Sequence, residues 1–322
     1  MRDGIRSLRN QHANPKPPDD EQRHDMQTRN LGEIRFILYG TEGTSREIES
    51  EEEYNFLINL HCNIKSSIPF IIKKSAASLH LLAIIFLKKM LKKDTDNERT
   101  AIFEKLAKIQ KVKIKFRGKE LTLLCNSRTF NLIHQVFVRN QYDLGESVIK
   151  NKIILDIGAN VGDSSLFCAF FEPKLVYAFE PMQHSFDILQ KNIAINSLQK
   201  VIIPIKKGCS SKNEFVSVLA GVDASIGNIG KTNKENEQIE LVIIDDFLGN
   251  SKVDLIKMDI EGHEEAALLG AQKTIQKFKP VLTFSAYHKQ SDKVRLPEVV
   301  TSIRNDYRIK LNKFYEEDFF CD

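Results

Sequence analysis

Residues 152–165 form the stretch that most constrains how this chain can fold. Residues 153–157, Asp156 excepted, are an apolar run with strong strand preference. Gly158 ends the run, and a polar segment typical of a helix start follows it. A buried strand that passes through glycines into a helix is a common binding place for nucleotide-like ligands. The stretch therefore predicts a ligand site between a strand and a helix.

The pattern after residue 152 alternates between strand-like and helix-like segments. Such alternation predicts an α/β fold, Rossmann-like, with a mostly parallel twisted sheet and helices on both faces. The expected strands are 152–157, 175–179, 201–206, 253–258 and 281–285. The expected helices are 163–171, 183–197 and 264–278, and an extra hairpin is expected from 214–219 and 238–243.

The chain before this α/β region divides into three further parts. Residues 1–30 are polar, charged and proline-containing, which predicts a disordered N-terminal tail. The next part is expected to be mainly helical; it spans 31–111, with a short strand at 31–39 and helices at 46–60, about 70–93 and 97–111. Residues 112–125 alternate on both sides of a glycine turn and predict a β-hairpin linker. The α/β domain itself is expected over 126–322.

Composition excludes several classes of protein. The five cysteines form no CxxC pair, so a disulfide framework or a structural zinc site is not expected. This cysteine usage, and an N-terminus without an apolar core, predict a cytoplasmic protein. The longest apolar run, 79–87, is far shorter than the ~20 residues of a membrane span, so no transmembrane segment is predicted. The net charge of +4 is spread along the chain and does not indicate a nucleic-acid partner.

The acidic residue Glu180 narrows the choice of ligand. It ends the second expected strand, about 20 residues after the first, where a carboxylate can bind two ribose hydroxyls. A dinucleotide would require glycine where Asn160 stands, and Asp156 would repel its pyrophosphate. S-adenosyl-L-methionine has no phosphate and carries positive charge, so it is the expected cofactor. An NAD-dependent oxidoreductase is disfavoured, and a strand–helix turn without a ligand is the remaining alternative.

A second informative stretch runs from 253 to 271. Apolar strand residues lead into Asp259, Glu261 and His263, and alternate positions of an extended chain point the same way. These three groups could thus converge at the carboxyl end of the fourth strand, beside the first. Their types permit a metal, but three ligands so close in sequence more often form a helix-entry network. No metal site is therefore assigned.

Together these segments resemble the FkbM family of S-adenosylmethionine-dependent methyltransferases, over about 112–311. The resemblance rests on DIGANVGDSS (156–165), AFEP (178–181), DLIKMDIEGHEEAALLGA (254–271), KP (279–280), AYHKQSD (286–292) and LPEVV (296–300). It implies a class I methyltransferase fold, with 126–322 as the methyltransferase domain. Residues 1–110 have no clear counterpart in the family. Residues 313–322 are short for the final antiparallel strand, which puts a fully paired sheet edge in question.

The resemblance also implies where the cofactor binds. The cofactor-binding residues it suggests are Asp156, Gly158, Asn160, Gly162, Asp163, Ser164, Glu180, Cys209 and Asp259. Members of such a family usually methylate hydroxyls of sugars, polyketides or related molecules. The expected function is therefore O-methylation of a hydroxyl on a glycan or secondary metabolite. The alternative is a non-catalytic cofactor-binding or partner module with the same fold.

Methyl transfer is a direct displacement that requires alignment and can require removal of the hydroxyl proton. His263 and Glu261 are the leading base candidates, and His288, after the fifth strand, is the third. Each has a structural alternative: Glu261 as an acid near a helix dipole, His263 as a cap, and His288 as a loop residue. The identity of the acceptor and the oligomeric state are not specified by the sequence.

Overall fold

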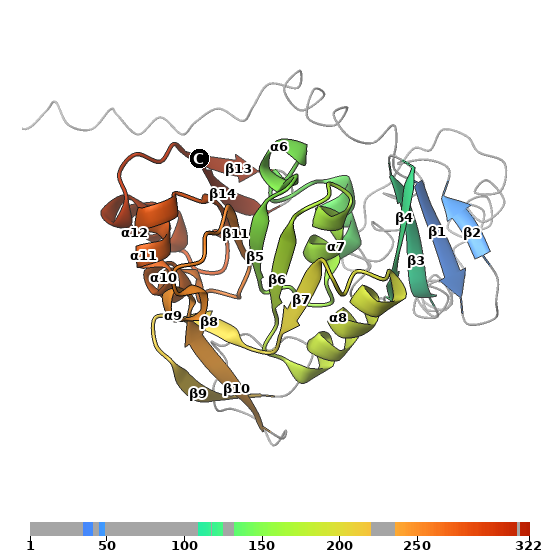
Figure 1. The fold of residues 1–322 in the computed structure, drawn as a ribbon, viewed down its shortest axis with the longest axis horizontal. Coiled ribbons are helices and arrows are strands. Elements are labelled where there is room, and N and C mark those ends of the chain that lie inside the picture. The colour runs from blue at the N-terminus through green and yellow to red at the C-terminus, as the bar shows by residue number, and fades with distance from the viewer. Residues whose placement is uncertain are drawn as a thin grey trace, which may run out of the picture.

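The computed structural model describes residues 35–40, 45–48, 109–116, 118–124, 132–219, 236–313 and 316–322. Its main element is a seven-stranded sheet of order β13-β14-β12-β11-β5-β6-β7 (Figure 1). The strands are β5 Ile153–Ile157, β6 Leu175–Phe179, β7 Ile202–Ile205, β11 Leu255–Met258, β12 Val281–Ser285, β13 Ile309–Lys313 and β14 Glu317–Cys321. The first five pair in parallel, and β14 runs antiparallel to β12 and β13. The α/β expectation is confirmed.

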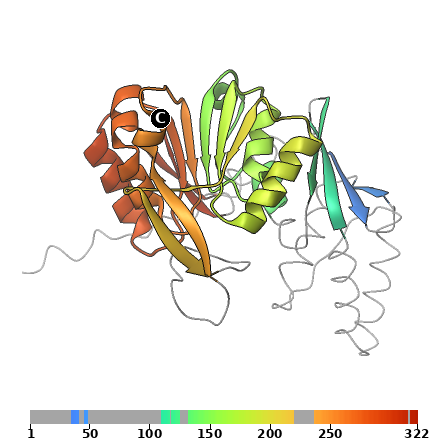
Figure 2. The same cartoon turned by 60° about the horizontal axis from the view of Figure 1, so that its bottom comes forward.

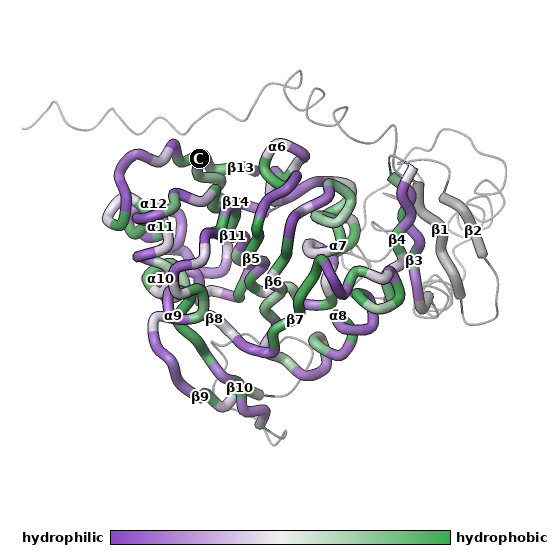
Figure 3. Tube along the Cα trace, viewed as in Figure 1, coloured by the Kyte–Doolittle hydropathy of each residue, from purple (hydrophilic) through white to green (hydrophobic). Residues whose placement is uncertain are grey.

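Helices cover both faces of this sheet, as the turned view of Figure 2 shows. They are α6 Glu146–Ile149, α7 Asp163–Ala169, α8 Gln183–Ile195, α9 Ile244–Leu248, α10 Glu264–Gly270, α11 Gln272–Phe278 and α12 Asp292–Ile303, with a π-helical turn, His134–Val138, before α6. Strand alternation sends Ile154 into a core with α6–α8 and Leu155 into a second core with α9–α12. Figure 3 shows hydrophobic residues along the central strands.

The predicted elements of the α/β part match the structure closely, with one break. The strands at 175–179 and 281–285 have the predicted bounds. The predicted helix 264–278 is divided at Ala271 into α10 and α11. Gly270 ends α10 against β8 (Gly208–Ser210), where a Cβ atom would lie 2.1 Å from the carbonyl oxygen of Ser210. The break in the helix thus coincides with close packing of Gly270 on β8. Sequence periodicity does not reveal such packing.

The predicted extra hairpin is present as β9 (Glu214–Leu219) and β10 (Asn236–Ile243). It belongs to a small sheet of order β8-β10-β9, in which β8 pairs in parallel with β10. That third strand has only three residues, too few for a sequence pattern to identify. The small sheet places Ser210 against α10.

The expectation that the chain end is too short for a paired sheet edge is wrong. Strand β14 pairs with β12 on one side and β13 on the other, over four and five residue pairs. Five residues are enough, because β12 and β13 are themselves five residues long.

The N-terminal part contains a sheet of order β2-β1-β3-β4. Its strands are β1 Arg35–Gly40, β2 Ser45–Ile48, β3 Ile109–Phe116 and β4 Lys119–Leu124. The predicted hairpin is thus half of a larger sheet. The predicted helices 46–60 and 97–111 are wrong at 46–48 and 109–111, where pairing with β1 makes strands. The expectations for 1–30, 49–108 and 125–131 lie outside the described residues, and the domain boundaries stay a prediction.

Strand β4 lies beside α8 and attaches this sheet to it (Figure 1). The amide of Thr122 donates to the side-chain oxygen of Asn196, and the amide of Leu124 donates to that of Asn192, both at 2.7 Å. Phe116 also contacts the edge of Phe170, 5.5 Å between ring centres. The hairpin therefore shares a hydrophobic core with the α/β part. Within the described ranges, no helix combines the length and apolarity that crossing a membrane requires.

Candidate active site

The candidate residues gather where strands β5, β6, β11 and β12 end. Carboxyl ends of parallel strands meet at one edge of a sheet. Strands β6 and β7 follow β5 on one side of it, and β11 and β12 lie on its other side, so the strand order reverses between β5 and β11. The loop at 158–162 follows β5, and Glu180 follows β6. Asp259 follows β11, and His288 follows β12. Most of the predicted site residues are thus brought to one edge of the sheet.

The glycines of the β5 loop are required by the packing of the chain itself. Gly158 has φ +78°, and a Cβ atom there would lie 1.9 Å from the carbonyl oxygen of Asp259. Gly162 has φ +94°, and a Cβ atom would lie 2.7 Å from Leu189. Neither position accepts a larger residue without displacement of its neighbours. The loop therefore holds one shape, close to the backbone of β11.

Asp156 lies beneath this loop, with 1% of its surface exposed. It accepts hydrogen bonds from Ser164 (2.6 Å) and Ser165 (2.5 Å) and pairs with Lys257 at 3.0 Å. These partners occupy its carboxylate, so Asp156 and Ser164 support the shape of the loop from below.

Lys257 is a functional candidate that sequence reasoning missed. It is 2% exposed, donates to the carbonyl oxygen of Gly158 at 2.9 Å and lies 4.9 Å from the ring centre of Tyr142. Burial opposes its charge, but the carboxylates of Asp156 and Asp259 outweigh burial and raise the pKa of Lys257. The available signal was a lysine within an otherwise apolar strand, a position that usually requires a charged partner.

The buried carboxylate of Glu180 is oriented by two backbone amides. Its Oε2 accepts the amide of Asn160 and its Oε1 accepts the amide of Met182, both at 2.9 Å. Each carboxylate oxygen has a second lone pair, so both can also accept a hydroxyl. Burial raises the pKa of Glu180 to about 7, against the effect of these two amides. Asp163, at the start of α7, is also buried, and burial raises its pKa to about 7.

Asp259 is the centre of a polar cluster at the end of β11. It accepts hydrogen bonds from the hydroxyls of Tyr142 (2.6 Å) and Tyr287 (3.3 Å), and His288 Nε2 lies 3.1 Å from its Oδ1. Burial favours the neutral acid. The hydrogen bond from His288 and the charge of Lys257 outweigh burial and hold the pKa of Asp259 well below its usual range. Both tyrosines were missed by sequence reasoning.

His288 lies among three carboxylates. Its Nε2 is 3.5 Å from Glu264 Oε1 as well as 3.1 Å from Asp259, and its Nδ1 is 3.5 Å from Glu261. Burial disfavours its charged form, but the bond to Asp259 and the charge of Glu264 prevail and raise the pKa of His288 to about 9. At neutral pH this imidazolium can donate a hydrogen bond and cannot accept a proton.

Two predicted site residues lie apart from this cluster. The Nε2 atom of His263 is 3.0 Å from the hydroxyl of Ser210, and burial lowers its pKa. Cys209 is 1% exposed within the core on the α9–α12 face, and burial raises the pKa of its thiol. The thiol therefore faces the core, and the backbone of β8 is the part that a ligand could reach.

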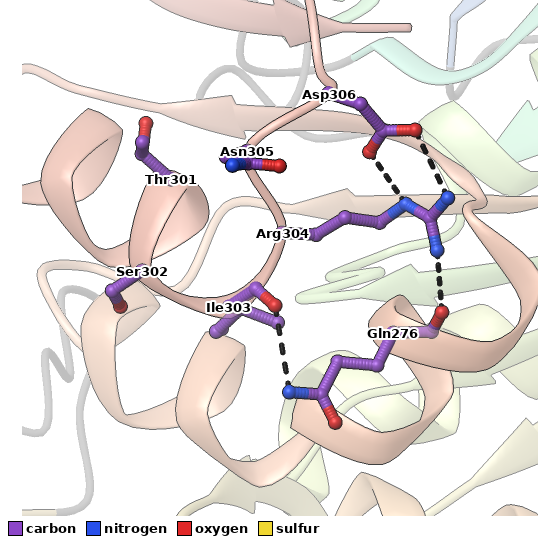
Figure 4. Close-up of a pocket in the computed structure, with 7 residues that line it drawn as sticks. All are labelled: Gln276, Thr301, Ser302, Ile303, Arg304, Asn305 and Asp306. Carbon is purple, nitrogen blue, oxygen red and sulfur yellow. Dashed lines mark hydrogen bonds and ion pairs between the residues drawn. The ribbon is translucent and has the colours of Figure 1, made fainter.

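The surface hollow shown in Figure 4 does not include the candidate site residues. It is lined by Gln276 and residues 301–306, at the ends of α11 and α12 that lead into β12 and β13. Those helix ends lie at the amino edge of the strands, opposite the site. Arg304 closes part of it through two hydrogen bonds to Asp306, at 2.6 and 2.9 Å.

The parallel sheet with its antiparallel β14, the β5 loop and Glu180 define a class I methyltransferase, which uses S-adenosylmethionine. Comparison with known families agrees: residues 156–309 match the sequence model of the methyltransferase FkbM domain. These residues therefore form an S-adenosylmethionine-dependent methyltransferase domain of the FkbM family, which confirms the resemblance seen in the sequence.

Two relatives are identical to this chain at about a quarter of the aligned positions. Hexuronic acid methyltransferase AglP of Haloferax volcanii is 26% identical over 182 residues, covering 54% of this chain and 71% of that protein. Methyltransferase sdnD of Sordaria araneosa is 25% identical over 175 residues, covering 43% and 67%. The crystal structure of a methyltransferase FkbM from Methylobacillus flagellatus matches with 22% identity and a TM-score of 0.44, covering 61% of this chain. That match spans only 54% of the solved chain.

Proposed function

We propose that the protein transfers a methyl group from S-adenosylmethionine to an oxygen atom of a sugar or a related hydroxylated metabolite. The observation that carries this proposal is the polar cluster of Asp259, Tyr142, Tyr287 and His288 beside the β5 loop. It offers hydrogen-bonding groups to a hydroxylated acceptor next to the place where the cofactor binds. A relative of this chain acts on a hexuronic acid, which supports a glycan acceptor.

The loop 158–162 and Glu180 bind the cofactor in this proposal. The ribose hydroxyls donate to the two oxygens of Glu180, whose orientation the amides of Asn160 and Met182 set. Asp163 lies beside the loop at the first turn of α7, where its carboxylate is proposed to attract the positively charged part of the cofactor. Cys209 contributes through its backbone alone.

The transfer is an in-line displacement. The acceptor oxygen forms a bond to the methyl carbon, the carbon–sulfur bond breaks, and its electron pair remains on sulfur in S-adenosylhomocysteine. The hydroxyl proton passes to a base. His288 is an imidazolium at neutral pH, and His263 faces Ser210. Glu261, with a 63% exposed side chain 3.5 Å from His288, is the base candidate that this geometry favours.

Two measurements test the proposal. Calorimetry should show binding of S-adenosylhomocysteine to the wild type, weakened at least about tenfold in Glu180→Ala. Mass spectrometry of glycan and metabolite extracts, incubated with enzyme and isotope-labelled cofactor, should show labelled methyl ethers or esters. Labelled products with methyl on nitrogen or carbon would overturn the oxygen assignment, and a wild type that binds no S-adenosylhomocysteine would overturn the proposal as a whole.

A further inference from the structure

Asp259, Glu264 and His288 form a compact group of possible metal ligands, here called the strand-end triad. One ligand atom from each lies within 4.8 Å of the others. The three come from different segments: the end of β11, the start of α10 and the loop after β12. The fold, and not proximity in sequence, thus brings them together.

The distances within the strand-end triad suit one coordination sphere. Octahedral ligands about 2.1 Å from an ion lie about 3 Å from their neighbours in that sphere. His288 Nε2 is 3.1 Å from Asp259 Oδ1 and 3.5 Å from Glu264 Oε1. Because one ligand atom of each residue lies within 4.8 Å of the others, side-chain adjustments can bring all three to one ion.

The burial of Glu264 is an independent indication. It is 1% exposed; its Oε1 accepts the amide of Ile260 at 3.0 Å and lies 3.5 Å from His288 Nε2. Buried carboxylates are costly unless they are paired or coordinate a metal, so the position of Glu264 beside His288 and Asp259 suits a cationic partner.

The surroundings of Asp259 add support. The hydroxyls of Tyr142 and Tyr287 donate to its carboxylate, and such outer hydrogen bonds commonly orient carboxylates that bind metals. The nearby Lys257 is held by Asp156 and the carbonyl oxygen of Gly158, and therefore does not occupy the centre of the triad.

We propose that the strand-end triad binds a divalent cation that accepts both oxygen and nitrogen ligands, such as Mn²⁺. Glu261 and His263, the neighbours in sequence, are not ligands: Glu261 is 63% exposed, and His263 contacts Ser210.

The role of the ion rests on the proposed function. Three protein ligands leave coordination positions open for two neighbouring oxygen atoms of the acceptor. Bound there, a hydroxyl loses its proton more easily and is aligned toward the methyl group. The site therefore favours acceptors with two adjacent oxygens, such as vicinal diols or hydroxy acids.

Mn²⁺ binding to the full-length protein, followed by electron paramagnetic resonance, tests the site. One Mn²⁺ per chain is expected for the wild type. Glu264→Gln and His288→Ala should each weaken Mn²⁺ binding about tenfold or more. The matched controls are Glu265→Gln, which alters an acid paired with Arg295, and His263→Ala; both should bind Mn²⁺ as the wild type does. Retained S-adenosylhomocysteine binding verifies that each variant is folded.

The outcomes separate the two proposals. A wild type that binds S-adenosylhomocysteine but no Mn²⁺ overturns the cation site and leaves the proposed methyl transfer standing. Equal Mn²⁺ affinity in the wild type, Glu264→Gln and His288→Ala also overturns the site. Binding lost in both variants and kept in both controls supports it. If the site binds Mn²⁺ but a chelator leaves methyl transfer unchanged, the role of the ion in acceptor binding is overturned.

Discussion

At the scale of single residues, two buried charged groups determine the properties of this site. Lys257 is enclosed by carboxylates and holds the β5 loop to β11, whereas Glu180 is the residue that we propose binds the cofactor ribose. The first is expected to contribute to stability and the second to affinity for the cofactor. Each therefore gives a prediction with a different measurement.

Replacing Lys257 with Met should destabilise the fold by roughly 3–5 kcal/mol, because it leaves Asp156 buried without its cationic partner. Urea denaturation followed by circular dichroism measures the free energy of unfolding. The matched control is Lys252→Met: Lys252 is 61% exposed and paired with Asp254, so its loss should cost about 1 kcal/mol or less. Similar losses in the two variants would contradict the role given to Lys257.

Affinity for S-adenosylhomocysteine should rise with pH. The pKa of Glu180 is raised to about 7 in the free protein, and ribose hydroxyls donate to its ionised form. Binding should therefore strengthen as pH passes through about 7 and level off above it, by roughly tenfold between pH 6 and 8. Calorimetry at these pH values measures the change. Glu180→Gln should bind more weakly and lose this rise; a variant that keeps the rise would assign it to another group, such as Asp163.

At the scale of elements, the β5 loop and β11 are built against each other. The carbonyl oxygen of Asp259 occupies the space that a side chain at Gly158 would need. Lys257 donates to the carbonyl oxygen of Gly158 from the same strand. The shape of the cofactor loop and the position of Asp259 therefore change together.

Gly158→Ala should abolish detectable binding of S-adenosylhomocysteine, a loss of about a hundredfold or more, because its Cβ would lie 1.9 Å from the oxygen of Asp259. The matched control is Gly249→Ala. Gly249 also has positive φ, +56°, but nothing lies within 4 Å of its Cβ position. That variant should lose roughly 1–3 kcal/mol of stability, because φ +56° with ψ −110° is a backbone conformation that favours glycine, and it should keep its binding. Wild-type affinity in Gly158→Ala would contradict this account.

At the scale of the whole molecule, the N-terminal hairpin and the cofactor loop are joined through one side chain. Asn192 on α8 accepts the amide of Leu124 on β4 and donates to the carbonyl oxygen of Val161, both at 2.7 Å. It is fully buried. The hairpin is thus connected to the site by direct hydrogen bonds.

Asn192→Ala should destabilise the fold by roughly 2–3 kcal/mol, because the buried amide of Leu124 and carbonyl of Val161 lose their partner. Hydrogen exchange measured by mass spectrometry should become faster in both β4 and the loop at 158–162. Asn196→Ala is the control, because Asn196 bonds to Thr122 and to the backbone of Asn192, and no hydrogen bond joins it to the described loop at 158–162. Faster exchange in β4 alone is expected for it. The same result for Asn192→Ala would refute the connection.

Most strands and helices of residues 152–285 were predictable, because they are long enough to carry their own periodicity, whereas α9 and α12 were not predicted. Strands 175–179 and 281–285 were predicted to the residue. The short strands β2 and β8 were not predicted, because they form by pairing with β1 and β10. Pairing between distant strands leaves little local signal in the sequence.

The sequence by itself determined the class of fold, the cofactor and the acids at the strand ends, because these depend on local order along the chain. Tertiary structure decided which acid meets which histidine. The expectation that Asp259, Glu261 and His263 point the same way assumed an extended chain. Instead the backbone turns at Glu261, with φ +56°, and at Gly262, with φ +90°. That turn leaves Glu261 exposed and directs His263 to Ser210. Glu264 and His288, which follows β12, complete the cluster around Asp259.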